Sequence, residues 1–359
     1  MIRPRILLAA GLIIASCLAT PQVIRLSGAE SLPDALSDRE FWKITTEFSE
    51  ADGYFRSDNL LSNELTFPYI LPELEKKAST GRVYVGVGPE QNFNYIAVLR
   101  PKMAFIVDVR QDNQRLHMMY KALFRLANDR ADFVSLLFSR RRPEGLTAAS
   151  TPEQIFSAYA TAGAETTDEL YQSNLKAIFD ELIEIHGFAL TPEDQSRIEK
   201  IYGAFTRFGP EIRYSSNQGG GGFGGMNQPS YAELMMADDI EGRPASYLAT
   251  EQSFRIVKDL EARNLLVPVV GNFGGPKAIR AVAQYLTEHD AVVSAFYLSN
   301  VEMYLNQQNL WEKFCRNVAT LPLDDHSFFI RSARGGGYGR GIGLNLALAP
   351  IAGEVKDCQ

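Results

Sequence analysis

Four short apolar segments, separated by stretches with helical periodicity, constrain the fold of this chain more than any other feature. The segments span residues 82–87, 102–109, 265–270 and 291–298, and β-branched residues recur in all of them. Each is followed by a stretch with apolar residues at helical spacing, namely residues 91–99, 113–126, 277–287 and 301–321. Parallel strands need crossovers of this kind, so the alternation predicts an α/β protein with a mostly parallel sheet and right-handed crossovers.

The C-terminal part of the chain predicts a different strand pairing. Residues 327–331 and 342–348 are strand-like, and the residues between them are rich in Gly and Arg and have no helical period. Two strands joined without a helix favour an antiparallel hairpin. A helical insertion is expected at about residues 150–260, because Thr151 and Thr191 each precede a Pro and an acidic residue, a pattern typical of helix starts.

The expected domain organisation is one large sheet domain with attachments. We expect a signal peptide at residues 1–16, a tether at 17–37 and an N-terminal helical segment at 38–80, with Ser37 or Asp38 as its first cap. The sheet domain with its insertion then spans 81–349, and a tail follows at 350–359. Within the insertion, residues 218–225 contain six glycines, which predicts either a lid or a surface link.

The first residues predict export. Arg3 and Arg5 precede an apolar run at residues 6–15, and small residues follow, which is the pattern of a secretory signal. Residues 14–17 also resemble a bacterial lipobox, in which the chain is cut before the cysteine and Cys17 is acylated. This predicts a membrane-anchored envelope lipoprotein that faces the periplasm or the outside. Two alternatives are a plain signal cleaved near Ala19 and an uncleaved anchor.

Charge and composition limit the classes of partner that this chain can bind. The 359 residues include 36 Lys and Arg against 43 Asp and Glu, a formal charge of −7, so no basic excess is present to follow a nucleic acid. The four His are scattered, and no metal-ligand spacing appears. If Cys17 is acylated, Cys315 and Cys358 remain, and they could form one disulfide in an oxidising compartment. The sequence leaves the oligomeric state open.

The first two strands predict a ligand-binding corner. Gly86 and Gly88 end the first strand and allow a ligand to approach the backbone, and Glu90 follows in the same turn. Asp108 ends the second strand, where a carboxylate can accept hydrogen bonds from both hydroxyls of a ribose. Arg110 could pair with Asp108. The alternative is that the glycines only form the turn and that Asp108 only caps a helix.

A second group of residues predicts a substrate side. Asn272 and Phe273 follow the third strand, Lys277 adds positive charge nearby, and Asn300 follows the fourth strand. Tyr231 flanks the glycine-rich run and is a further candidate. The structural alternatives are that Asn272 satisfies the backbone of a turn and that Asn300 caps a helix.

The order of elements resembles the Rossmann-like fold of class I S-adenosylmethionine-dependent methyltransferases, over residues 81–129 and 265–349. Residues 84–93 and 266–280 also resemble an uncharacterised bacterial family with that fold. The resemblance implies S-adenosylmethionine at the corner with Asp108, and a methyl acceptor held at Asn272 and Phe273. The motif departs from the methyltransferase pattern, since Gln91 stands where a third glycine or small residue is usual.

These features predict a membrane-tethered, methyltransferase-like protein with a nucleotide- or small-ligand-type pocket at the carboxyl ends of its strands. Export conflicts with S-adenosylmethionine chemistry, because that cofactor is a cytoplasmic compound. Two alternatives follow from the conflict: a non-catalytic exported binding or envelope-assembly lipoprotein, and a non-methylating envelope enzyme that uses the same fold.

Overall fold

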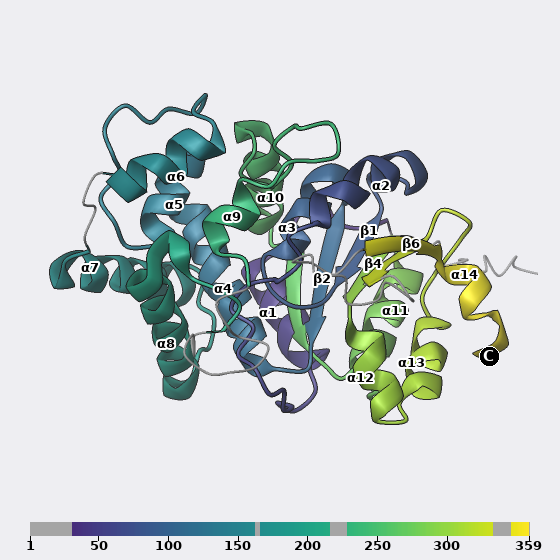
Figure 1. Ribbon diagram of the computed structural model, residues 1–359. Helices are drawn as coiled ribbons and strands as arrows, with labels where there is room; N and C mark the ends of the chain where they lie inside the picture. The colour runs from purple at the N-terminus through teal and green to yellow at the C-terminus, as the bar shows by residue number, and fades with distance from the viewer. Residues whose placement is uncertain (1–30, 162–165, 216–227, 333–345, 359) are drawn as a thin grey trace, which may run out of the picture.

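The computed structural model describes residues 31–161, 166–215, 228–332 and 346–358. The expected signal peptide, Cys17 and the glycine-rich run lie outside them. A six-stranded sheet forms the centre of the molecule, in the order β3-β2-β1-β4-β5-β6 (Figure 1). The strands are β1 (Val83–Gly86), β2 (Met103–Asp108), β3 (Leu266–Val270), β4 (Val293–Ser299), β5 (Phe328–Ser332) and β6 (Leu346–Pro350).

Neighbouring strands from β3 to β5 pair in parallel, and only β5 and β6 pair antiparallel. The predicted α/β class, the mostly parallel sheet and the final antiparallel pair are therefore confirmed. Strands β1, β2 and β3 are buried at every residue, which explains why they read as continuous apolar runs rather than alternating ones. Pro268 is tolerated in the middle of β3 because β3 is an edge of the described sheet.

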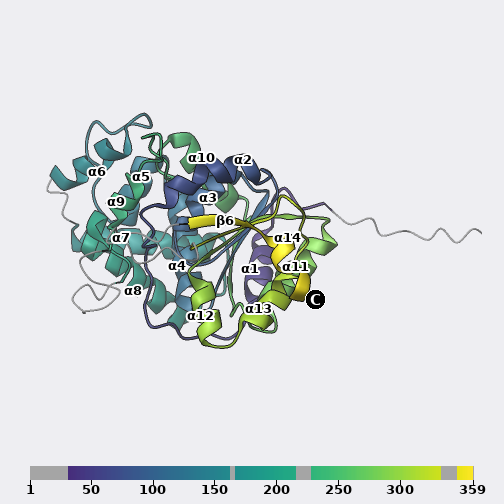
Figure 2. The same ribbon diagram turned by 45° about the vertical axis from the view of Figure 1, so that its right-hand side comes forward.

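Helices cover the sheet in two groups, which Figures 1 and 2 show on opposite sides of it. Helices α3 (Gln91–Leu99), α4 (Gln111–Leu126) and α10 (Glu251–Ala262) pack on one another. Helices α11 (Ala278–Glu288), α12 (Val301–Gln307) and α13 (Trp311–Val318) form the other group. Helix α1 (Asp38–Glu47) packs against β3, and Phe48 just after it contacts Phe105 of β2 and Tyr285 of α11.

The insertion lies beside α4, on the left in Figure 1, together with α5 (Arg130–Leu137), which precedes the expected bounds. Its elements are α6 (Pro152–Thr161), α7 (Asp168–Phe179), a π-helical turn (Asp180–Ile185), α8 (Pro192–Phe208) and α9 (Tyr231–Met235). Thr191 forms a capping box with Asp194 at the start of α8, as its Thr-Pro-Glu pattern indicates. Asp194 also pairs with buried Arg115 of α4, which joins the insertion to the sheet domain.

Two local expectations differ from the structure. Residues 301–321 form two helices rather than one, because Asn309 takes a left-handed conformation with φ of 55° and ends the first. The last described strand, β6 at Leu346–Pro350, extends past the expected end at residue 348, and the first part of the expected segment lies outside the described residues.

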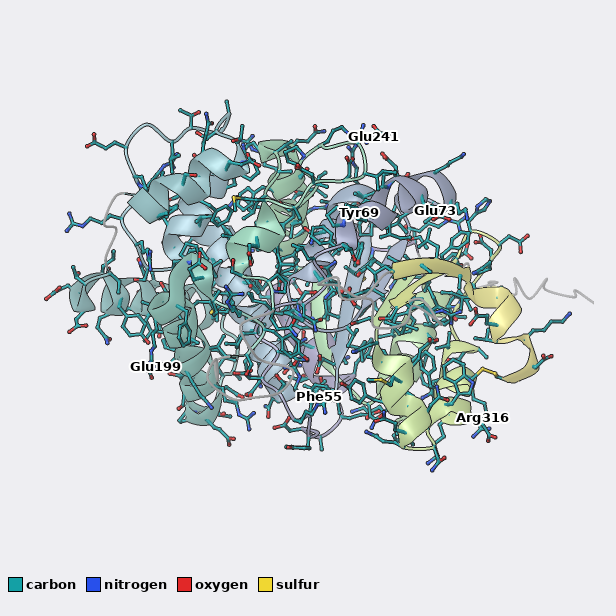
Figure 3. All side chains as sticks on the ribbon, viewed as in Figure 1. Phe55, Tyr69, Glu73, Glu199, Glu241 and Arg316 are labelled. Carbon is teal, nitrogen blue, oxygen red and sulfur yellow. A yellow bond between two sulfur atoms is a disulfide. The ribbon has the colours of Figure 1, made fainter. Side chains whose placement is uncertain are left out.

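The N-terminal segment adds a second short helix, α2 (Leu71–Lys77), after a 3-10 turn (Phe67–Ile70). Ser37 caps α1 through a capping box with Glu40, as expected. At the other end, α14 (Ile351–Glu354) leads to Cys358, which forms a disulfide with Cys315 of α13 (Figure 3). In the described part of the chain, no helix is both long and apolar enough to span a bilayer.

Candidate functional site

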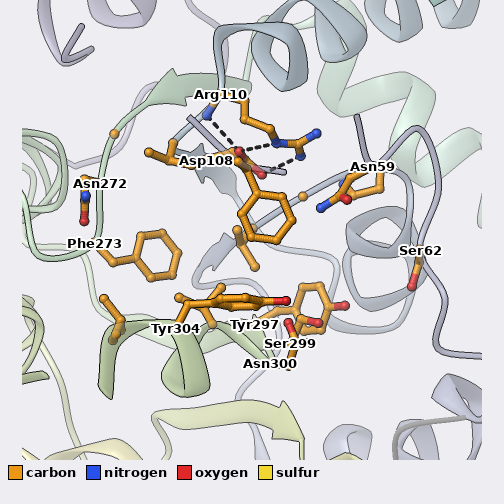
Figure 4. A pocket seen from close by; sticks show the side chains of 18 of the residues that line it. Asn59, Ser62, Asp108, Arg110, Asn272, Phe273, Tyr297, Ser299, Asn300 and Tyr304 are labelled. Carbon is orange, nitrogen blue, oxygen red and sulfur yellow. Dashed lines mark hydrogen bonds and ion pairs between the residues drawn. The ribbon is translucent and has the colours of Figure 1, made fainter. Parts of the chain in front are cut away.

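A pocket with a cavity volume of about 150 Å³ opens at the carboxyl ends of β1 to β4 (Figure 4). Strand order reverses between β1 and β4, since β2 and β3 lie on one side of β1 while β4 and β5 lie on the other. In open α/β sheets, ligands bind at this switch point. The lining residues from the sheet side are Val87, Gly88, Pro89, Asp108, Val109, Arg110, Gly271, Asn272, Phe273, Tyr297 and Ser299.

The outer wall of the pocket comes from segments that the sequence analysis did not assign to a site. The loop between α1 and α2 contributes Tyr54, Phe55 and polar residues at positions 59, 62 and 63. Tyr214 from the insertion and Tyr304 from α12 complete this wall. The rings of Phe55 and Tyr304 meet edge to face with centroids 5.1 Å apart, so the loop and α12 close on each other at the pocket.

Asp108 and Arg110 form a buried ion pair at one side of the pocket (Figure 4). The Nε and Nη2 atoms of Arg110 donate to the two carboxylate oxygens at 3.0 and 2.9 Å, and the Arg110 backbone N–H adds a third bond of 2.9 Å. Nη1 of Arg110 donates to the carbonyl of Asp58. Burial alone would lower the pKa of Arg110, but the Asp108 carboxylate outweighs it and raises that pKa. The charge of Arg110 is therefore retained in spite of its burial.

Glu64 lies against the pocket wall and is fully enclosed. The hydroxyl groups of Tyr297 and Ser299 donate to its two carboxylate oxygens, each at 2.7 Å. In the described part of the chain, no basic side chain lies within ion-pair distance of it. Burial raises the pKa of Glu64 to about 7, although the two hydrogen bonds lower it. This carboxyl group can therefore change its charge near neutral pH.

Glu90, a predicted ligand residue, lies in the interior rather than in the pocket lining. Its carboxylate oxygens accept the backbone N–H of Ser62 at 3.1 and 3.3 Å, and Ser62 lines the pocket. Burial raises the pKa of Glu90 to about 8, and the nearby Glu64 raises it further. Glu90 thus holds the pocket loop from behind.

The two predicted glycines of the β1–α3 turn differ in their surroundings. Gly88 has a φ of 77°, and a Cβ added there would meet no atom within 4 Å, so this residue opens to the pocket. A Cβ on Gly86 would lie 1.9 Å from Oδ1 of Asn92, so Gly86 serves close packing. Nδ2 of Asn92 donates to the carbonyls of Val87, Gly88 and Pro89 at 2.7 to 3.1 Å, which locks the turn.

Asn272 and Phe273 both line the pocket, on the β3 side. Oδ1 of Asn272 accepts the Gly274 N–H at 2.9 Å, and the Phe273 ring packs on Phe314. Asn272 therefore does what its structural alternative describes, since it stabilises the turn, and it also borders the cavity. Lys277 is not among the lining residues; its ammonium donates to the carbonyl of Ser49 at 2.8 Å.

The two remaining candidates are separated by the fold. Asn300 lines the pocket beside Ser299. Its side chain makes no capping hydrogen bond to α12, so the capping alternative is not seen. Tyr231 lies in the core of the insertion, fully buried, where its hydroxyl is 2.5 Å from that of Tyr247. Tyr231 thus supports the insertion and does not border the cavity.

Sequence reasoning missed Glu64, Asn92 and the residues of the outer wall. Glu64 does have a signal in the sequence: it is the only charged residue between positions 59 and 72. A single carboxylate in an otherwise uncharged stretch of this length favours burial of the stretch around it.

A family model described as a domain of unknown function, DUF7790, matches residues 59–342. The chain belongs to this family. The matched region begins at a pocket residue, Asn59, and includes Glu64 and the lining residues of β1 to β4. No curated protein matches the chain. In the described residues, no group of three or more His, Cys, Asp or Glu is arranged to hold a metal ion.

Proposed function

We propose that this protein binds a compact, uncharged ligand with a flat ring, of the nucleoside type, in the pocket at the carboxyl ends of β1 to β4. The observation that supports the proposal is the position of the pocket at the point where strand order reverses, with aromatic rings and amide groups in its wall. Tyr214 and Tyr304 contribute aromatic rings to the wall, and Asn59, Asn63 and Asn300 offer amide donors and acceptors.

The charge of the pocket favours an uncharged ligand. Among the described lining residues, only Asp108 and Arg110 carry charge, and each neutralises the other. A charged ligand would lose its hydration shell here without gaining an unpaired partner of opposite sign. A neutral ring system loses much less hydration free energy when it enters the pocket.

S-adenosylmethionine is a second candidate, because the strand order β3-β2-β1-β4-β5 and an acid at the end of β2 resemble the methyltransferase fold. The corner does not fit that cofactor in this arrangement. Arg110 takes three of the about four acceptor sites of the Asp108 carboxylate, which leaves too few for both ribose hydroxyls, and no unpaired carboxylate lines the pocket in the described residues to face the sulfonium charge. We derive no methyl-transfer step.

Calorimetric titration of the full chain with adenosine, S-adenosylmethionine and S-adenosylhomocysteine tests the proposal. We expect adenosine to bind, and Tyr304→Ala to weaken its binding tenfold or more, since base–aromatic stacking contributes about 1–3 kcal/mol. The matched control is Tyr69→Ala, an exposed tyrosine of the Phe67–Ile70 turn outside the pocket, which should bind as the wild type does. Absence of adenosine binding contradicts the proposal, and binding of S-adenosylmethionine alone supports the second candidate.

We also propose that the chain is exported and tethered to a membrane through acylated Cys17. The signal-like N-terminus and the lipobox-like residues support this, and so does the Cys315–Cys358 disulfide, a bond that persists in oxidising compartments. Labelling cells with radioactive palmitate should mark the wild type and Cys358→Ser, but not Cys17→Ser. An unlabelled, released wild type would indicate a plain signal, and a retained Met1 would indicate an uncleaved anchor.

A further inference from the structure

Ser299 occupies an unusual backbone position in the pocket. It is the last residue of β4, directly before Asn300 and α12, and its φ is 50°. The pairing of β4 with β5 shifts register between Tyr297 and Ser299. Residues with a β-carbon rarely adopt this left-handed conformation, and Asn or Gly takes it at less cost. A serine held there by the surrounding fold is thus a strained residue with its hydroxyl placed at a ligand pocket.

The side chain of Ser299 is paired with a carboxyl group that is shielded from water. Its Oγ donates to Oε1 of Glu64 at 2.7 Å, and Ser299 itself lines the cavity. The titratable groups around Glu64 are Tyr297 on β4, Tyr84 on β1, Tyr95 on α3 and Glu90 in the β1–α3 turn. None of these groups is positively charged, so none would hold Glu64 in its ionised form. Burial therefore favours transfer of a proton to this carboxylate.

We propose that Ser299 is a nucleophile that attacks the carbonyl carbon of an ester bound in the pocket, and that Glu64 takes the proton of its hydroxyl. The Oγ–carbon bond forms as the proton moves to Oε1 of Glu64. The bond from carbon to the leaving alcohol then breaks, and Glu64 returns the proton to that alcohol. Water hydrolyses the serine ester in the same way, so that serine and carboxylate are regenerated.

The surroundings of Ser299 fit this role. Asn300, the next residue in the chain, lines the same pocket and carries side-chain N–H groups of the kind that stabilise an oxyanion. Ester hydrolysis needs only water as its second reactant, so it can proceed in an exported protein that meets no cytoplasmic cofactor. The inference rests on the proposed function in one respect: the flat part of the ester occupies the pocket assigned to the ring of the ligand.

Labelling with a fluorophosphonate, a probe that reacts with nucleophilic serines, tests the inference. Intact mass and peptide mapping of the full chain should show one adduct, on Ser299, and none in Ser299→Ala. The matched control is Ser294→Ala, a serine of the same strand that is buried away from the pocket and donates to the carbonyl of Val83. It should be labelled as the wild type is. A wild type without adduct, or equal labelling of Ser299→Ala, overturns the inference.

The role of Glu64 has its own readout. The labelling rate should rise with pH through about 7 in the wild type, where Glu64 loses its proton. In Glu64→Gln it should fall 100-fold or more and lose this pH dependence, because a general base typically contributes about 10²–10⁴ in rate. If Glu64 only supports the structure, the thermal midpoint changes but the pH profile does not, and its assigned role is wrong. Retained adenosine binding in unlabelled Ser299→Ala separates failure of this inference from failure of the proposed function.

Discussion

The two sides of the pocket treat a buried carboxyl group in opposite ways. On the β2–β3 side, both oxygens of Asp108 accept hydrogen bonds from Arg110 in a buried ion pair. On the β1–β4 side, the carboxylate of Glu64 accepts from the hydroxyls of Tyr297 and Ser299, with no cation beside it among the described residues, and its pKa rises to about 7. Figure 4 shows the ion pair and Ser299 across the cavity from each other.

This difference comes from the partners and not from the depth of burial. Both carboxyl groups are almost completely removed from water. A guanidinium supplies charge and directed donors, which compensate for desolvation, whereas neutral hydroxyls supply donors without charge. One side of the pocket is therefore electrostatically fixed, and the other can exchange a proton with a ligand.

The largest effect on stability is expected from breaking the ion pair between Asp108 and Arg110. Arg110→Gln leaves the Asp108 carboxylate buried without a counter-charge, and we expect the free energy of unfolding to fall by about 3–5 kcal/mol. Urea denaturation monitored by circular dichroism measures this loss. The double variant Asp108→Asn with Arg110→Gln removes both charges and should recover much of it. A loss below about 1 kcal/mol in the single variant would mean that water already reaches the pair.

The titratable side predicts a pH effect on stability. The fold raises the pKa of Glu64 from 4.5 to about 7, so its contribution to stability is present below pH 4.5 and is lost as the pH rises through 7. The loss is on the order of 1 kcal/mol per pH unit in that window. Glu64→Gln mimics the protonated form and should flatten the slope of unfolding free energy against pH between about 5 and 7.

Two observations would sharpen this pH test. Glu90 remains in the Glu64→Gln variant and, with its pKa raised to about 8, should keep a residual slope up to that pH. The exposed Glu73 of α2 offers a control, because Glu73→Gln alters only a surface pair with Lys77. If Glu64→Gln and the wild type show equal slopes, the pKa of Glu64 is not raised in the fold, and the contrast between the two sides fails.

A smaller effect is expected from Asn272 on the fixed side. Asn272→Ala removes the acceptor for the Gly274 N–H in the turn after β3, and we expect a loss of about 1 kcal/mol in unfolding free energy. Asn272→Asp keeps an acceptor at this position and should retain most of the stability. A thermal melt of both variants measures the difference. Equal losses in both variants would show that the amide NH₂ group of Asn272, and not its oxygen acceptor, stabilises the turn.

The sequence predicted the floor of the pocket better than its walls. Strand ends follow from the periodicity of apolar residues, and parallel strands bring their carboxyl ends together, so Gly88, Asp108, Asn272 and Asn300 could be grouped in advance. The contacts that each of these residues makes could not be predicted. That Arg110 uses both oxygens of Asp108 depends on side-chain geometry that spacing does not determine.

The walls depend on contacts between distant parts of the chain. Leu60 donates its backbone N–H to the carbonyl of Tyr214, which brings the loop before α2 against the insertion. No local pattern near residue 60 or residue 214 indicates such a pairing. The placement of Glu64 behind Ser299 likewise joins residues 235 positions apart. These are the residues on which the proposed chemistry depends, and a structure was needed to find them.

The disulfide between Cys315 and Cys358 closes a covalent ring around the hairpin. Both β5 and β6 lie between these two cysteines, and β6 is the outermost strand on that side of the described sheet. The chain end therefore cannot peel away and carry β6 with it. Under reducing conditions that restraint disappears, and loss of β6 would expose the unpaired backbone of β5 to neighbouring molecules. Oxidation at this one bond thus ties the edge strand of the sheet to helix α13.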